Sequence, residues 1–219
     1  MSPFSSARRL TRAFRQIALA PAAALILIAT VALPAAAQTP SDVVAVLQDG
    51  LVNIMSNPPA SGTGNRSAAF TALVENTFDI NAMGAVAVGL DTYRSWSDAQ
   101  RATFLAAFAR FMVATHAARF ESAPGQTFSI EGSKAARAGR EIVHSRYSRA
   151  GRDPVAIDYL VRRSNEDWKI LDVYLDGSIS LLALNRSEFS SVLRDQGFEG
   201  FIAAMHAKAD ELSVPKATN

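Results

Sequence analysis

Apolar residues recur at helical spacing over the first part of the chain that follows residue 38. A capping pair, Ser41-Asp42, precedes the first apolar run and Pro58-Pro59 follows it, so the pattern predicts a helix between them. The longest run begins after Ser97, a good N-cap residue, and reaches about Phe120. The helices predicted in this part of the chain are residues 41–56, 67–76, 78–89 and 97–120.

From Thr127 the apolar period changes to two, which is typical of half-buried strands. The connections are short and contain Gly139, Gly151 and Asn165, so consecutive strands should pair antiparallel. Two helices finish the chain, and Gly197 between them favours the end of the first. This order predicts an α+β domain in which helices pack on one face of a four-stranded, mainly antiparallel sheet. The predicted strands are residues 127–131, 141–149, 154–163 and 168–175, and the predicted final helices are residues 187–196 and 200–212.

Apolar stripes on the longest predicted helix and on two predicted strands should face each other across the domain. Periodicity alone favours a packed core between sheet and helix, because such stripes are usually core, and it does not distinguish a filled core from a cavity. The stripes comprise Phe104, Phe108, Phe111 and Met112 on the helix, Val155, Ile157, Tyr159 and Val161 on the third strand, and Trp168, Ile170 and Tyr174 on the fourth.

The first 37 residues have the composition of a signal peptide. Four arginines precede an apolar segment from Ile17 to Leu33, and small residues at 34–37 provide a cleavage site before Gln38. A membrane anchor is the alternative, but Pro21 and the many alanines make a weak span, so we expect cleavage. The expected organisation is a signal peptide, residues 1–37, followed by a single domain, residues 38–219.

Removal of the signal peptide changes the charge balance. Four of the 22 basic residues precede Gln38 and no acidic residue does, so 18 basic and 20 acidic residues remain, a formal charge of −2. Nucleic-acid binding therefore loses its compositional support. The chain has no cysteine, which excludes thiol catalysis, Cys-based zinc sites and lipidation of a thiol.

Candidate catalytic and metal-binding residues are few. His116, His144 and His206 lie on three different predicted elements without metal-ligand spacing, so no metal site is predicted. Asp158 and Asp172 lie on adjacent predicted strands and could approach each other as a hydrolase pair. More often such strand carboxylates face solvent or pair with nearby arginines, here those at 146, 162 and 163.

The most specific pattern lies between Asp167 and Phe189, a strand, a turn and the start of a helix. In one register it resembles the C-terminal signature of the MlaC/Ttg2D (toluene tolerance) family of periplasmic phospholipid carriers. The turn at 176–180 departs from the Glu-Gly-Val-Ser common in phospholipid carriers and resembles the hopanoid-associated HpnM branch. The matching residues are Trp168, Ile170, Asp172, Val173, Asp176, Gly177, Ser180, Asn185, Arg186 and Phe189. Upstream, Phe78-Asp79, Val88-Gly89, Tyr93-Arg94, Gln100-Arg101, Phe104 and Phe108 resemble the family's helical half, so the resemblance spans about residues 42–208.

The resemblance implies an MlaC-like (NTF2-like) fold with an apolar pocket between sheet and helices. It implies a periplasmic carrier without enzymatic activity or cofactor, which shuttles a phospholipid between an inner-membrane ABC transporter complex and an outer-membrane lipoprotein complex. The alternatives are a hopanoid-pathway lipid binder and a periplasmic hydrolase on an NTF2-like scaffold that would use Asp158 and Asp172. Tyr93, Arg94 and Arg101 are expected at the pocket mouth or at a partner-docking surface. The residues expected to bind lipid are Phe104, Phe108, Phe111, Met112, Val155, Ile157, Tyr159 and Ile170.

Overall fold

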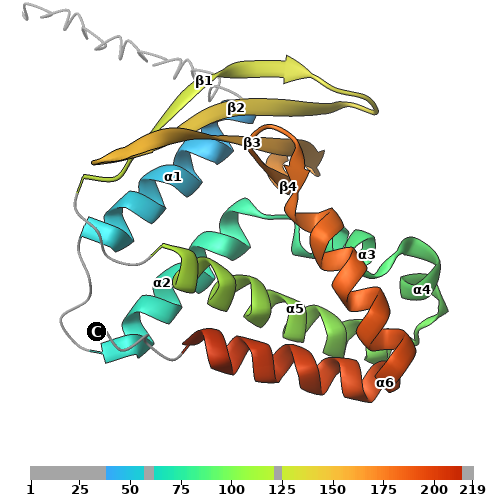
Figure 1. Cartoon of the computed structure of the whole chain (residues 1–219). Coiled ribbons are helices and arrows are strands. Elements are labelled where there is room, and N and C mark those ends of the chain that lie inside the picture. The colour runs from blue at the N-terminus through green and yellow to red at the C-terminus, as the bar shows by residue number, and fades with distance from the viewer. Residues whose placement is uncertain (1–37, 57–61, 121–124, 214–219) are drawn as a thin grey trace, which may run out of the picture. The chain divides into compact units, whose positions relative to one another are not determined.

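The computed structural model describes residues 38–56, 62–120 and 125–213. The predicted signal peptide, residues 1–37, lies outside the described residues. Five helices come first in the chain (Figure 1). They are α1 (Pro40–Ser56), α2 (Gly62–Thr77), α3 (Ile80–Val88), α4 (Leu90–Ser95) and α5 (Asp98–Arg119).

A five-stranded sheet and one further helix complete the domain. The strands follow each other in the order of the sequence, and every neighbouring pair is antiparallel. The predicted α+β class is confirmed, with one strand more than expected, because the turn after β4 leads into a strand of two residues. The remaining elements are β1 (Thr127–Ala135), β2 (Arg140–Arg149), β3 (Arg152–Ser164), β4 (Asp167–Leu175), β5 (Ile179–Ser180) and α6 (Leu181–Ser213).

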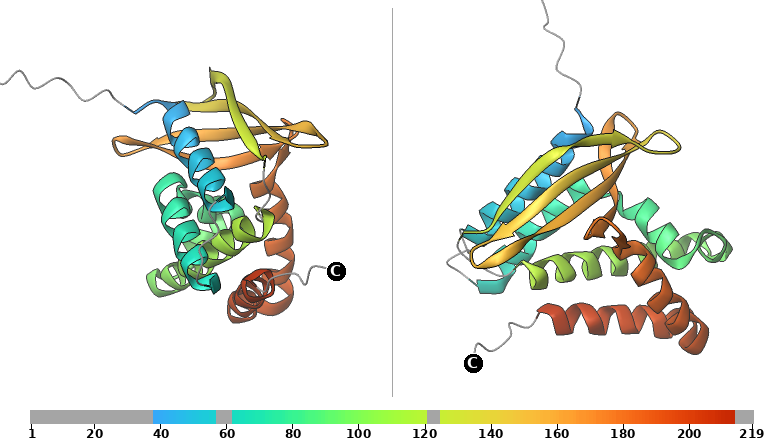
Figure 2. Two further views of the ribbon diagram at one scale, coloured as in Figure 1. Left: turned by 90° about the vertical axis from the view of Figure 1, so that its left-hand side faces the viewer. Right: turned by 45° about the horizontal axis from the view of Figure 1, so that its top comes forward.

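All the helices lie on one side of the sheet, as the views in Figure 1 and Figure 2 agree. Helix α1 is the nearest to the strands and contacts β1, β2, β3 and β4. Helix α5 packs between α2, α3 and α6 in the layer beyond. One face of the sheet is therefore covered, which is why β2 and β3 alternate between buried and more exposed residues. Within the described ranges, no helix has the length and hydropathy needed to cross a bilayer.

Helix α5 starts where the sequence predicts it, and a complete capping box fixes that start. The Ser97 hydroxyl accepts from the Gln100 backbone N–H at 3.2 Å, and the Gln100 side chain accepts from the Ser97 N–H at 3.0 Å. Helix α3 is capped by Asp79, whose carboxylate accepts from Ala82 N–H at 3.0 Å and from Arg162 Nε of β3 at 2.9 Å. The cap of α3 therefore also ties that helix to the sheet.

A β-bulge in β4 changes which residues of that strand face the helices. Val161 lies opposite Ile170 whereas Leu160 lies opposite Asp172, so Leu171 is an extra residue without a partner. The alternation reverses beyond the bulge, and Val173, opposite Tyr159, faces the helices together with Leu175. The expectation that Tyr174 shares a face with Trp168 and Ile170 is therefore wrong.

Helix α6 begins six residues earlier than predicted. Asp172 holds its start, since its buried carboxylate accepts from the Ser180 hydroxyl at 2.6 Å and from Leu182 N–H at 3.1 Å. The Ser180 hydroxyl in turn accepts from Ala183 N–H at 2.9 Å. Gly197 has non-helical backbone angles (φ 69°, ψ −173°), so it ends one helical segment and a second begins after a sharp bend, as predicted (Figure 1).

Candidate functional site

A cavity of about 340 Å³ lies between the sheet and the helices. Its volume is at the lower end of the range typical of ligand pockets, roughly 300–1,000 Å³. Most of its lining is aliphatic or aromatic, as expected of a site for an apolar ligand. The lining residues are Leu47 and Leu51 of α1, His116 and Arg119 of α5, Phe120, Tyr147 and Arg149 of β2, Val155, Ile157 and Tyr159 of β3, Val173 and Leu175 of β4, and Leu181 of α6.

Strand β3 runs from the rim of the cavity into its interior. The exposed fraction falls from 37% at Val155 to 7% at Ile157 and 2% at Tyr159. All three side chains point to the same face, because strand residues alternate, and Val155 and Tyr159 are about 13 Å apart along the strand. The cavity therefore has a solvent-exposed end beside Val155 and a buried end beside Tyr159.

The buried end is polar but uncharged. Gln48 Nε2 donates to Ser145 Oγ at 3.0 Å, and the Ser145 hydroxyl donates to the Ile157 carbonyl at 2.6 Å. Both side chains also interact with the Tyr159 hydroxyl. Burial raises the pKa of Tyr159 to about 12, so this hydroxyl stays protonated at neutral pH.

His116 adds an uncharged aromatic ring to the wall. Its ring packs edge-on against Phe78 at 5.1 Å between centroids and stacks with Phe120 at 6.4 Å. Burial lowers the pKa of His116 to about 4, so the imidazole is neutral at pH 7. Its Nδ1 lies 2.8 Å from the Met112 carbonyl oxygen and must donate to it, which leaves Nε2 without a proton.

The charged side chains of the lining are both arginines. Arg119 is in the last turn of α5 and Arg149 is the last residue of β2. Partial burial lowers the pKa of Arg119, but a guanidinium remains charged at any physiological pH. No Asp or Glu is among the lining residues, so the cavity combines apolar walls with net positive charge.

The comparison with known proteins identifies the family. Residues 46–207 of the chain match the family model described as MlaC protein. The chain belongs to the MlaC family. The family prediction made from the residues between Asp167 and Phe189 is thus confirmed, whereas the hopanoid-associated branch remains a hypothesis.

A solved structure has the same MlaC-like fold. It is the phospholipid-binding protein from Ralstonia solanacearum, determined in complex with a phospholipid. The alignment has a TM-score of 0.66 and 22% sequence identity, and covers 82% of this chain and 100% of that chain. At this identity the similarity establishes the fold, in agreement with the predicted architecture.

Three of the residues predicted to bind lipid in this MlaC-family chain line the cavity, namely Val155, Ile157 and Tyr159. The other five, Phe104, Phe108, Phe111, Met112 and Ile170, are buried in the hydrophobic core outside the lining. On α5, for example, the ring centroids of Phe104 and Phe108 lie 5.7 Å apart, and Phe201 of α6 is 5.9 Å from Phe104. A role of these five side chains in lipid binding stays a prediction.

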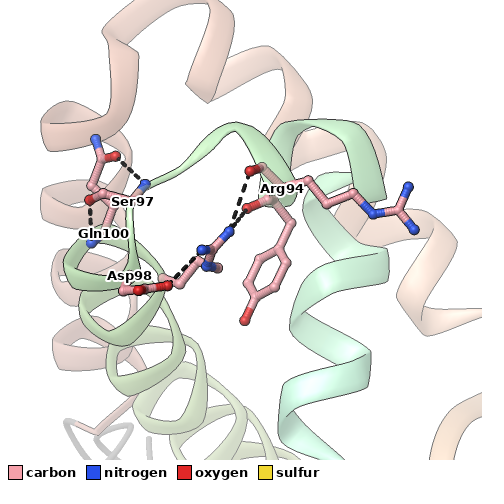
Figure 3. Close-up of polar contacts among 6 residues, drawn as sticks. Arg94, Ser97, Asp98 and Gln100 are labelled. Atoms are coloured by element: carbon pink, nitrogen blue, oxygen red, sulfur yellow. Dashed lines mark hydrogen bonds and ion pairs between the residues drawn. The ribbon is translucent and has the colours of Figure 1, made fainter.

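Tyr93, Arg94 and Arg101 lie at the opposite end of α5 from the cavity. Arg101 precedes Arg119 by 18 residues, about 27 Å along the helix. The Arg101 guanidinium donates to the Asp98 carboxylate at 2.6 Å and to the Arg94 carbonyl at 3.3 Å; Figure 3 draws the polar contacts around Arg94 and Asp98. The guanidinium also lies over the Tyr93 ring, 5.8 Å from the centroid. This cluster joins α4 to α5 and does not border the cavity, and a role in docking a partner stays a prediction.

Several lining residues could not be found from the sequence pattern. Val173 and Leu175 were not predicted to line the cavity, because the bulge at Leu171 does not change the composition of the strand. Tyr147 could have been predicted, since it lies two and four residues after buried Ser145 and Val143 and therefore on the same face of β2. Arg119 and Arg149 were not singled out, because nothing local distinguishes a cavity-lining arginine from a solvated one.

The two carboxylates considered for hydrolysis have separate partners. Asp158 Oδ2 lies 3.0 Å from His144 Nδ1, whereas Asp172 binds Ser180 and backbone amides at the start of α6. The expected pairing with nearby arginines is also wrong, because Arg146 pairs with Glu131 and Arg162 with Asp79. No cluster of three or more His, Asp or Glu side chains placed to hold a metal occurs in the part of the chain that the structure describes.

Proposed function

We propose that this MlaC-family chain is a periplasmic lipid carrier without enzymatic activity, which encloses the acyl part of a phospholipid between its sheet and its helices. The observation that carries the proposal is the apolar cavity whose wall descends from Val155 at the rim to buried Tyr159. The phospholipid complex of the similarly folded Ralstonia protein supports it.

The physical task of such a carrier is to keep acyl chains away from water. Each CH₂ group removed from water contributes about 0.8 kcal/mol, so a free lipid rarely leaves a bilayer for an aqueous compartment. An apolar cavity lowers this cost without any covalent chemistry. A two-chain phospholipid is larger than the ligands that fill pockets near 340 Å³, so the cavity must widen on binding.

The remaining steps follow from the family. The signal peptide at residues 1–37 would direct the chain to the periplasm. There it would accept a phospholipid from one membrane complex and release it on docking to another, between an inner-membrane ABC transporter and an outer-membrane lipoprotein complex. The partners of Asp158 and Asp172 described above favour this role over hydrolysis, since each carboxylate is engaged in holding the fold.

The test is native mass spectrometry of the exported protein, purified from a Gram-negative host, followed by extraction and identification of bound lipid. We expect phospholipid at a fixed stoichiometry. Val155→Glu places a charge at the cavity rim and should release the lipid, whereas Val46→Glu is the matched control. Val46 is a 51% exposed valine of α1 that is not among the lining residues. Lipid retained by folded Val155→Glu at the wild-type level would contradict binding at this cavity.

A further inference from the structure

The two arginines of the cavity lie at its solvent-exposed end, on facing elements. Arg149 follows Tyr147 by two residues on β2, and Tyr147 is opposite the rim residue Val155. Arg119 directly precedes Phe120, whose ring centroid is 6.4 Å from that of Tyr147. The Phe120–Tyr147 contact therefore brings the end of α5 to the end of β2, and one guanidinium comes from each side.

Within the described residues, neither arginine has a carboxylate partner. Six arginines of the described ranges pair with an Asp or Glu, and no carboxylate in those ranges lies within 4.0 Å of Arg119 or Arg149. His116, which also lines the cavity, is neutral at pH 7. Two guanidinium groups that pair with no described carboxylate, next to an apolar surface, favour a ligand that is anionic at one end and apolar at the other.

We infer that Arg119 and Arg149 bind the phosphate group of the lipid and so select anionic over uncharged lipids. The inference rests on the proposed function, since it concerns the head group of the lipid whose chains occupy the cavity. Guanidinium groups donate parallel N–H bonds that match phosphate oxygens, and such charge-assisted bonds are stronger than neutral ones. The chains would extend from this end along β3, past Ile157 toward Tyr159.

The site at Arg119 and Arg149 is distinct from the predicted cavity mouth, which comprised Tyr93, Arg94 and Arg101. Arg94 and Arg101 are cations too, but they already pair with Asp91 and Asp98 and lie at the other end of α5. An anionic head group placed there would be about 27 Å from Arg119. Substitution of Arg119 or Arg149 should therefore weaken the preference for an anionic lipid, whereas substitution of Arg94 should not.

The experiment measures the affinity of delipidated protein for lipids with identical chains and different head groups: phosphatidic acid and uncharged diacylglycerol. The readout is the ratio of the two dissociation constants. We expect the wild type to prefer phosphatidic acid by tenfold or more, since one hydrogen bond to a charged group corresponds to about a tenfold change or more. Arg119→Gln and Arg149→Gln should each lower the ratio, and the double variant should bring it close to one.

Arg137→Gln is the matched control, because Arg137 is an exposed arginine in the turn at the other end of β2. It should leave the ratio unchanged. Arg94→Gln tests the rival position. A fall in the ratio for Arg94→Gln, or a preference that persists in the double variant, would overturn the assignment of the phosphate to Arg119 and Arg149.

Two further results distinguish a lipid phosphate from a free anion, and the head-group inference from the proposed carrier function. Inorganic phosphate should not displace phosphatidic acid at equal concentration, because the chains supply most of the affinity. Displacement would mean that the arginines bind a free anion, and would overturn the head-group assignment. Equal binding of both lipids by the wild type would overturn the selectivity alone, whereas binding of neither lipid would overturn the proposed function as well.

Discussion

At the scale of single residues, His116 shows how burial decides a side chain's chemistry. The histidine spacing in the sequence excludes an obvious metal site but does not indicate the environment of this ring. In the structure it packs between Phe78 and Phe120, and burial lowers its pKa to about 4. At neutral pH it therefore behaves as one more aromatic residue of the cavity wall.

We predict that protonation of His116 destabilises the fold in acid. A histidine in the unfolded chain has a pKa near 6.5, so the unfolded state binds the proton first as the pH falls. The stabilisation is complete above pH 6.5 and is lost between pH 6.5 and about 4, by at most about 3 kcal/mol. Urea unfolding across this range should show a smaller loss for His116→Phe, which keeps the ring packing. Equal losses in both proteins would contradict the prediction.

At the scale of elements, the start of helix α6 depends on a residue of strand β4. Local patterning places the helix start at residue 187, but the cap comes from Asp172 on β4. Burial is the main influence on Asp172 and raises its pKa, against its hydrogen bonds to Ser180 and the backbone, which lower it. The residue is thus held in place by the contacts that define the β4–α6 corner.

We predict that Asp172→Ala lowers the free energy of unfolding by about 1–3 kcal/mol, because it leaves Leu182 N–H, Val173 N–H and the Ser180 hydroxyl without their acceptor. The control is Asp153→Ala, the loss of an exposed carboxylate on β3, which should change stability by less than about 0.5 kcal/mol. Urea unfolding of both variants measures the difference. A similar small effect of both substitutions would show that Asp172 does not hold the corner.

At the scale of the whole molecule, the cavity is a space that three strands and three helices leave unfilled between them. An ordinary core would fill such a space, since unfilled volume reduces stability. The residues of the helical layer, such as fully buried Phe104 and Phe108, are packed in that ordinary way. The open volume beneath β3 and β4 is therefore a local property of the fold.

We predict that filling this space stabilises the protein and reduces lipid binding. Val173→Phe adds a ring at the cavity wall and should raise the free energy of unfolding of delipidated protein by about 0.5–2 kcal/mol. The matched control is Val161→Phe, at a fully buried position of β3 outside the lining, which should lower it by about 1–3 kcal/mol through overpacking. Chemical unfolding and lipid extraction give the two readouts. Destabilisation by both substitutions would mean that the space at Val173 is already filled.

Regular elements with strong local signals were predictable. Helix α5 was expected at residues 97–120 and runs from Asp98 to Arg119, because its cap and its apolar stripe are both local. Helix α4 and strand β5 were not predicted, since six and two residues are too few to establish a period. The bulge in β4 was not predicted either, because one extra residue leaves the composition of the strand unchanged.

The sequence by itself determined the order of the elements, the α+β class, the resemblance to the MlaC family and the apolar face that carries Val155, Ile157 and Tyr159. These properties follow from local periodicity and from matched residues in one register. Only the tertiary structure decided that this face borders open space while the Phe104 stripe meets a filled core, and that Arg119 and Arg149 line the same cavity. The reason is physical: periodicity determines the face on which a side chain lies, whereas the volume between two faces depends on every side chain that reaches it from both sides.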